Sequence, residues 1–218
     1  MSTTASSLPR SHAADGRKGL IRQANEAAIL RAAEQVFAHA GFEGATMAEI
    51  ADKAGLPKAN LHYYFGSKKD LYEAVLDTVL HDWLAPTEVI RAEADPRDAL
   101  TQYVKAKLAL SFERPDASKV FANELLHGAP VVGESLRGEL RRLVLDKAAV
   151  VDGWIAAGRM APVDSTHLFF TIWAATQTYA DFDVQVRAVL GHRSFTAADQ
   201  ARAEAHVLGM VLRGCGLA

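Results

Sequence analysis

The hydrophobic positions of this chain recur with the period of an α-helix along almost its whole length. Near the N-terminus, apolar residues fall at i, i+4, i+7, i+8 and i+11, namely Ile29, Ala33, Val36, Phe37 and Ala40. This spacing places them along one face of an amphipathic helix. Gly41 follows the last of them and is expected to end the helix.

Two short helices are expected next. Thr46 and Glu49 have the spacing of a capping box, in which the threonine side chain accepts from the Glu49 amide. The buried face of this second helix is predicted to consist of Met47, Ile50, Ala51 and Ala54. Gly55 ends it after about two turns, and Pro57 is well placed to open a third helix over residues 58–65.

The rest of the chain continues in the same helical pattern. Ser67 and Asp70 cap a fourth helix, which Pro86 must kink or break because proline has no amide proton. Further helix boundaries are expected where prolines recur, at Pro96, Pro115, Pro130 and Pro162. The last two helices are predicted over residues 165–189 and 197–213. The fold class is therefore all-α, with about nine helices.

The pattern divides the chain into three parts. Residues 1–22 are expected to form a disordered basic arm, with or without a role in binding DNA. Residues 23–80 are expected to form a helix-turn-helix domain, and residues 81–218 a larger helical domain. Two short helices joined by a tight turn with glycine are typical of helix-turn-helix proteins, although an ordinary helical hairpin has the same spacing.

Composition narrows the class of protein. Half of the 218 residues are hydrophobic, which is ample for a buried core. The net charge is −2, yet residues 10–31 hold five basic and two acidic residues, 5 − 2 = +3. The single cysteine excludes an intrachain disulfide. No signal peptide, membrane-spanning run, catalytic motif, metal cluster or cofactor loop is found, so a cytoplasmic protein that is not an enzyme and needs no cofactor or metal is expected.

The third helix carries the strongest functional signal. With 100° per residue, Leu61 and Phe65 point inward, and the opposite arc consists of Ala59, Asn60, His62 and Tyr63. This arc offers hydrogen-bonding groups, a methyl group and no carboxylate, which suits a helix that reads base edges. Lys58 stands in the first turn, where contact with a phosphate would explain a cation that opposes the helix dipole.

Residues 41–51, 54–55 and 61–71 together resemble the TetR family of bacterial repressors. The resemblance implies that Thr46 and Lys68 anchor phosphates of double-stranded operator DNA at the two ends of the motif. It also implies that the operator is faced by Lys58, Ala59, Asn60, His62 and Tyr63. One departure from the family pattern is visible, because the family more often has Tyr at position 62 and His at position 64.

The C-terminal segments 82–86, 125–130 and 172–182 are similar to a RutR-like subgroup, the regulators of pyrimidine utilisation, whose effector is uracil. Trp173, Gln177 and Asp181 are spaced i, i+4 and i+8 on one helical face. An amide can pair with the edge of a pyrimidine, an indole can stack on it, and a carboxylate can accept a ring N–H. Weaker candidates for ligand binding are Trp83, Phe121 and Glu124.

For these residues and for the last helix, purely structural interpretations stay open. Trp173 could belong to the core, with Gln177 and Asp181 exposed or at a dimer interface. The last predicted helix carries a stripe of small residues that would allow a close helix contact in a homodimer, or a buried seam within one chain. The stripe consists of Ala198, Ala201, Ala205, Gly209 and Leu212.

The sequence therefore predicts a DNA-binding regulator, a repressor of pyrimidine catabolism genes that a small pyrimidine such as uracil releases from its operator. A second hypothesis keeps the DNA-binding role and replaces the effector by a lipophilic drug, an acyl thioester or another metabolite. A third, remote hypothesis is a helical small-molecule binding protein or enzyme without DNA function.

Overall fold

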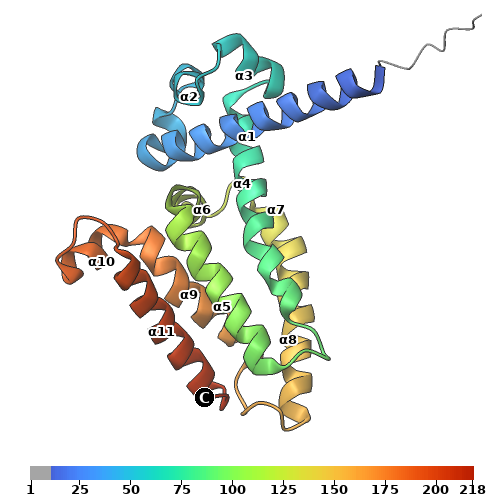
Figure 1. Ribbon diagram of the computed structural model, residues 1–218, viewed down its shortest axis with the longest axis vertical. Helices are drawn as coiled ribbons and strands as arrows, with labels where there is room; N and C mark the ends of the chain where they lie inside the picture. Colours follow the sequence, from blue (N-terminus) through green and yellow to red (C-terminus); the bar gives the residue numbers. More distant parts are fainter. Residues whose placement is uncertain (1–10) are drawn as a thin grey trace, which may run out of the picture. The chain divides into compact units, whose positions relative to one another are not determined.

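The computed structural model in Figure 1 describes the backbone of residues 11–218 and the side chains of residues 19–218. Every regular element among these residues is helical, as the sequence predicts. The chain divides into two compact units, one ending at Tyr72 and the other running from Glu73 to Ala218. This boundary lies eight residues before the predicted one at residue 80.

The first unit packs one long helix and three shorter helical segments around a small core. Its elements are α1 (Ser11–Gly44), α2 (Met47–Ala54), α3 (Lys58–Tyr64) and the first turn of α4 (Lys68–Leu84). The predicted stripe of α1 is buried at Ile29, Ala33 and Phe37. Ile50 of α2 and Leu61 of α3 are fully buried as well. The inward faces of these helices are therefore those that the hydrophobic spacing predicts.

The helix ends of this unit follow the predicted chemistry. Thr46 and Glu49 form the capping box at the start of α2, with reciprocal side chain to backbone hydrogen bonds. Gly55 ends α2 in the left-handed conformation, with φ 66° and ψ 29°. Gly41 interrupts the helical dihedrals near the end of α1, with φ 68°. The amide of Asp70 donates to Ser67 Oγ at the start of α4.

The expectation of a disordered arm over residues 1–22 needs correction for its second half. Helix α1 already begins at Ser11, so residues 11–22 are helical. The segment contains no proline, and its alanine, arginine and lysine residues favour a helix that continues into the amphipathic region. Residues 1–10 lie outside the described residues.

The second unit is a bundle of helices. Its elements are the rest of α4, the 3₁₀ helix η1 (Ala85–Val89), α5 (Pro96–Glu113), α6 (Pro115–Leu126), α7 (Gly133–Ser135), the π-helical turn η2 (Leu136–Leu140), α8 (Arg141–Ala156), α9 (Ser165–Asp181), α10 (Asp183–Leu190) and α11 (Ala197–Gly214). Helix α5 lies side by side with α9 and α11 (Figure 1), and α8 packs on α9. Their shared core includes Tyr103, Trp154 and Phe169.

The prolines mark the boundaries as expected. Pro86 lies in η1, directly after α4 ends, while Pro96 and Pro115 occupy the first position of α5 and α6. One predicted helix, over residues 165–189, is wrong, because Phe182 leaves helical geometry and separates α9 from α10. The change of direction lets Asp183 pair with Lys119 of α6 at 2.9 Å and with Arg187 at 2.8 Å.

The left-handed turn at Gly55 yields a test of the helix-turn-helix geometry. An added Cβ would meet no atom within 4 Å there, so the cost of Gly55→Ala comes from the backbone conformation alone. We expect a loss of about 1 kcal/mol in the free energy of unfolding, measured by urea denaturation followed by circular dichroism. Gly153→Ala, inside α8, is the matched control and should stabilise by about 0.5–1 kcal/mol. A Gly55→Ala protein as stable as the wild type would contradict the assigned turn.

Candidate nucleic-acid interface and ligand cavity

Helix α3 presents a polar, carboxylate-free surface to solvent. Tyr63 is 74% exposed, whereas Leu61 on the opposite side is fully buried. Exposed side chains on the outer face are Lys58, Ala59, His62 and Tyr63, and Asn60 is half-buried. The structure thus places the five predicted residues on one short helix, with the orientation that the helical wheel predicts. Donors and a methyl group on such a helix suit the major groove.

The ring of Tyr63 has an ordered support. Its centroid lies 5.4 Å from that of Tyr64, and the rings meet edge to face at 88°. The hydroxyl of Tyr64 in turn accepts a hydrogen bond of 3.2 Å from Asn25 Nδ2 of α1. The direction of the exposed ring is therefore set by a contact that reaches back to the first helix.

Thr46 and Lys68 hold the helix-turn-helix together from within. Thr46 Oγ1 donates to Glu49 Oε2 at 2.9 Å, so its hydroxyl proton is in use within the capping box. Lys68 Nζ donates to carbonyl oxygens of Phe42 at 2.6 Å, Ala45 at 3.0 Å and Glu43 at 3.3 Å. Carbonyls at the C-terminal end of a helix lack intrahelical partners, and a cation satisfies them well. The structure gives both residues a positioning role, and their predicted phosphate contacts stay a prediction.

The second unit encloses a cavity of about 170 Å³. Its walls come from α4, α5, α6, η2 and α9, which are far apart in the sequence. The lining residues are Leu80, Trp83, Leu84, Lys107, Phe121, Leu125, Leu136, Leu140, Trp173 and Gln177. Four of the six residues predicted to bind a ligand are therefore brought to one cavity, namely Trp83, Phe121, Trp173 and Gln177.

The aromatic walls of this cavity are fixed by neighbouring contacts. The rings of Trp83 and Phe121 lie 6.3 Å apart between centroids, tilted by 32°. Trp173 Nε1 donates to the hydroxyl of Tyr103 at 2.7 Å, so the indole offers its face and not its N–H. Burial raises the pKa of Tyr103 well above its ordinary value, against the hydrogen bond from Trp173, and keeps the phenol neutral. The aromatic side chains of the cavity are thus held in fixed orientations by their neighbours.

Two polar groups reach this mostly apolar space. The amide of Gln177 makes no hydrogen bond with any residue that the structure describes. The ammonium of Lys107 lies 3.8 Å from the centroid of the Trp83 ring. Burial lowers the pKa of Lys107 to about 7, and the charge of Asp181 opposes this shift. Sequence reasoning missed Lys107, although it interrupts the buried apolar stripe of α5 between Val104 and Leu108.

Asp181 and Glu124, the other two predicted ligand-binding residues, are not among the residues that line the cavity. Asp181 accepts a hydrogen bond from Ser118 Oγ, and burial raises its pKa against the influence of Ser118 and nearby lysines. Glu124 Oε1 accepts from the amides of Val131 at 2.6 Å and Val132 at 3.2 Å. Glu124 therefore holds the chain that follows α6, which explains why this carboxylate is buried.

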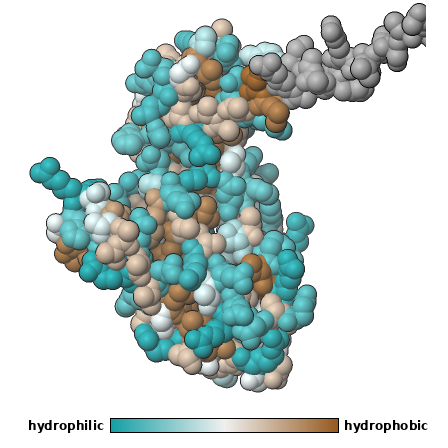
Figure 2. Space-filling view, in the orientation of Figure 1, coloured by the Kyte–Doolittle hydropathy of each residue, from teal (hydrophilic) through white to brown (hydrophobic). Residues whose placement is uncertain are grey.

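Helix α11 has three distinct sides. Ala203, Val207 and Val211 are buried against the bundle. Of the predicted stripe of small residues, Ala198, Ala201 and Ala205 are exposed and Gly209 is half-buried, while Leu212 is half-buried and packs against the core. A third side forms a groove of about 490 Å³ with α9, lined by residues that include Thr171, His206 and Met210. Figure 2 shows apolar patches over α10 and α11 on a mostly hydrophilic surface.

Other classes of site find no support in the described part of the chain. It contains no group of three His, Cys, Asp or Glu side chains that could hold a metal ion. None of its helices is both long enough and apolar enough to cross a bilayer. Cys215 is buried, and burial raises the pKa of its thiol to about 11. A thiol of that kind is a poor nucleophile.

Comparison with known proteins assigns both units. A family model described as "Bacterial regulatory proteins, tetR family" matches residues 29–75, and one described as "YcdC-like protein, C-terminal region" matches residues 76–218. The HTH-type transcriptional regulator RutR of Escherichia coli K12 is 44% identical over 176 residues, which cover 81% of this chain and 83% of RutR. The HTH-type transcriptional regulator TtgR of Pseudomonas putida is 35% identical over 111 residues, 48% of this chain and 50% of TtgR.

Solved structures agree on the fold. The TetR family regulator PfmR of Thermus thermophilus superposes with a TM-score of 0.64 at 21% identity, covering 85% of this chain and 94% of PfmR. AibR, solved with isovaleryl coenzyme A and operator DNA, gives a TM-score of 0.62 at 18% identity, with 85% of this chain and 97% of AibR covered. The sequence relatives are transcriptional regulators, and the solved structures share their fold. The chain belongs to the TetR family of bacterial regulatory proteins and is a DNA-binding transcriptional regulator homologous to RutR.

Proposed function

We propose that this regulator represses genes of pyrimidine catabolism or utilisation and leaves its operator when a small pyrimidine such as uracil occupies the cavity. The observation that carries the proposal is the cavity itself, with flat aromatic walls and two polar groups, Lys107 and Gln177, at its lining. Part of its wall, around Trp83, Leu125 and Trp173, lies in segments whose sequence is similar to the pyrimidine-utilisation regulators. A planar ring with carbonyl and N–H groups matches such a surface.

The size of the cavity supports a small ring over the alternative effectors. Pockets for drug-sized ligands measure about 300–1,000 Å³, whereas an apolar cavity of about 150 Å³ accommodates benzene. At about 170 Å³ this cavity suits a single six-membered ring. A lipophilic drug or an acyl thioester would need a substantial rearrangement of the helices around it, which disfavours the second hypothesis.

Helix α4 supplies the coupling that the proposal requires. Its first residue, Lys68, is hydrogen-bonded to the end of α1 in the DNA-binding unit. Its last turns carry Trp83 into the cavity wall, and neighbouring Asp82 forms an ion pair with Arg114 at the start of α6. A ligand that prefers one position of this helix shifts the protein between operator-binding states by its difference in affinity for them.

The self-association surface follows from α9 and α11. TetR-family regulators are typically homodimers, and two half-sites about one helical turn apart need paired recognition helices. We infer that the groove between α9 and α11 lies at the centre of this interface, since Met210 at its edge is 59% exposed and Phe170 of α9 is 47% exposed. The small residues of α11 extend the surface on the neighbouring side.

Replacing Tyr63 by alanine should weaken operator binding by about 1–3 kcal/mol and leave the fold intact. The reason is that the exposed ring and hydroxyl stand at the middle of the outer face of α3. Fluorescence anisotropy on the upstream DNA of the gene, at fixed salt, measures the effect. Phe182→Ala removes an aromatic ring at the start of α10 that is 58% exposed and should leave the affinity unchanged. Equal affinities for both variants would argue against α3 as the reading helix.

Replacing Gln177 by leucine should abolish release of DNA by uracil and leave DNA affinity without uracil unchanged. Leucine keeps the size of the side chain and removes the only amide of the cavity lining. The same anisotropy assay, with and without uracil, provides the measurement. Gln185→Leu, at an exposed position of α10, is the matched control and should respond like the wild type. A normal response of the Gln177→Leu protein would remove this residue from the effector site.

Two aspartate substitutions on α11 separate the two sides that are available for self-association. Met210→Asp should convert the homodimer to a monomer in analytical ultracentrifugation, because it buries a charge without a partner in the groove. Ala205→Asp should have a smaller effect, since it lies on the small-residue side. If only Ala205→Asp dissociates the protein, that side forms the centre. A dimer in both variants would exclude α11 from the interface.

A further inference from the structure

The cavity is lined by a lysine whose charge is not needed to pack the helices around it. Lys107 lies in the middle of α5 and is only 2% exposed. The neighbouring buried positions of α5 are apolar or hydroxylated, and include Tyr103, Val104 and Leu108. An apolar side chain of similar length would fill this position without the cost of burying a charge. The ammonium group therefore calls for a functional explanation.

The partners of Lys107 in the protein leave its hydrogen-bonding capacity unused. Its Nζ atom lies on the face of Trp83, and Asp181 of α9 acts on it through charge. No described residue accepts a hydrogen bond from this atom. The residues that α4, α6, η2 and α9 contribute to the lining carry no titratable group. Tyr103, one turn earlier on α5, is held neutral by burial.

The other polar group of the cavity is ambivalent. A glutamine amide carries one acceptor and two donors, and a half turn about its last bond exchanges them. Gln177 can therefore pair with a ring that presents a carbonyl group or with one that presents an amino group. A lysine ammonium offers donors alone, and its charge strengthens a bond to an oxygen acceptor. Of the two polar groups, only Lys107 can therefore discriminate between a ring with a carbonyl group and a ring with an amino group.

We propose that Lys107 is the specificity-determining residue of the effector cavity, donating a hydrogen bond to a ring oxygen and thereby selecting oxo-substituted rings over their amino-substituted counterparts. The inference rests on the proposed function, because it concerns the same cavity. A ring with an amino group at this place would set donor against donor and leave the buried ammonium without an acceptor. Sites built around such a hydrogen bond reject an analogue that lacks it far more strongly than apolar pockets do.

The same contact links effector binding to protons. In the free protein, burial holds the pKa of Lys107 at about 7. An oxygen acceptor favours the charged form and raises this pKa in the complex. Affinity for uracil is then fully present below pH 7 and falls as the pH rises above 7, because free Lys107 must take up a proton to bind. Near pH 7 the uptake amounts to about half a proton for each uracil.

The first experiment uses the wild-type protein alone. Titration calorimetry with uracil, in two buffers of different ionisation enthalpy between about pH 6 and about pH 8.5, gives the affinity and the proton uptake. A second titration uses 2,4-diaminopyrimidine, which keeps the ring and replaces both oxygens by amino groups. We expect proton uptake with uracil and a preference for uracil of about 100-fold or more. Uracil binding without proton uptake, or equal affinity for both rings, would overturn the role of Lys107.

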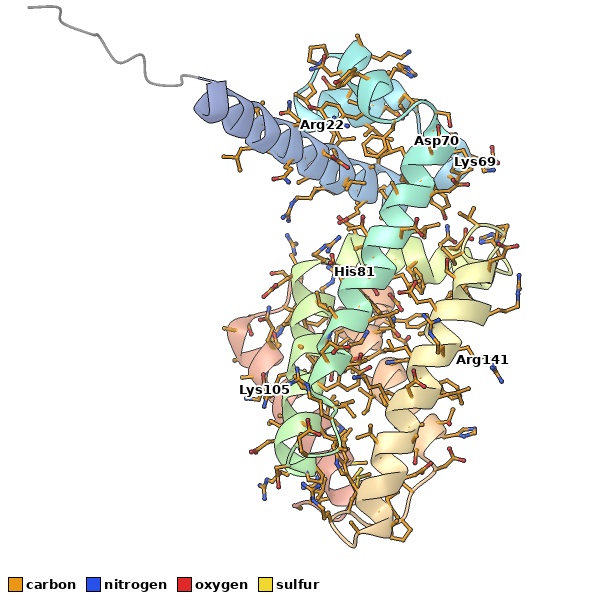
Figure 3. The ribbon with its side chains drawn as sticks, turned by 90° about the vertical axis from the view of Figure 1, so that its right-hand side faces the viewer. Arg22, Lys69, Asp70, His81, Lys105 and Arg141 are labelled. Atoms are coloured by element: carbon orange, nitrogen blue, oxygen red, sulfur yellow. The ribbon has the colours of Figure 1, made fainter. Side chains whose placement is uncertain are left out.

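The second experiment removes the ammonium. Lys107→Met keeps the unbranched apolar stem, and we expect it to lower uracil affinity by about 10- to 100-fold and to abolish both the pH dependence and the preference between the rings. Lys105→Met is the matched control, since Lys105 on the outer side of α5 (Figure 3) is half exposed and pairs with Glu204 at 2.9 Å. This control should bind both rings as the wild type does. Operator binding without ligand verifies that each variant is folded.

The outcomes separate the two proposals. If the wild type binds uracil and Lys107→Met binds it equally well with the same pH dependence, the inference on Lys107 fails and the proposed effector stands. If the wild type binds neither ring while it still binds operator DNA, the pyrimidine effector itself is wrong, and the specificity argument falls with it.

Discussion

The geometry of the DNA-binding unit depends on how the carbonyl end of α1 is satisfied. The last carbonyl groups of a helix have no partners within it, and leaving them unpaired away from water costs free energy. Lys68 answers this need from the first turn of α4, with its ammonium shared among the oxygens of Phe42, Glu43 and Ala45 and set 4.6 Å from the centroid of the Phe42 ring. One side chain therefore fixes the start of α4 on the end of α1.

A second set of contacts then determines what α4 can communicate. Trp83 belongs to the cavity wall, and Asp82 next to it is paired with Arg114, where α6 begins. The same helix is thus bound at one end to the DNA-binding unit and at the other to the residues around the effector cavity. Rigid secondary-structure elements that two sites share are one way in which energetic coupling is carried between them, and α4 is an element of this kind.

Particular residues show how much of the fold could be predicted from the sequence. The spacing of Ile29, Ile50 and Leu61 predicted the inward faces of α1, α2 and α3, because burial of one helical stripe leaves a strong periodic signal. The helix caps at Thr46 and Gly55 could be predicted equally well, since few residue types fit those backbone conformations. The break at Phe182 could not be predicted, because residues 165–189 contain neither proline nor glycine, and only the fold shows that Asp183 pairs with distant Lys119.

The residues of the candidate site could also be predicted only in part. Trp173 and Gln177 were identified together by their helical spacing, and Trp83 and Phe121 as weaker candidates. Only the fold shows that all four share one cavity. Asp181 has the helical spacing of a ligand-binding residue, yet Ser118 engages its carboxylate beside the cavity. Lys107 is a charged residue within an apolar stripe, and the hydrophobic periodicity alone gives no reason to assign it a function. Its chemistry becomes visible once the ring of Trp83 and the unpaired amide of Gln177 lie around it.

The length of α4 determines how far apart its two sets of contacts lie. Lys68 and Trp83 are fifteen positions apart in one uninterrupted helix, which at about 1.5 Å per residue separates them by about 22 Å along its axis. The turn of α4 that carries Trp83 is itself part of the cavity wall, so a change in this wall acts directly on the helix.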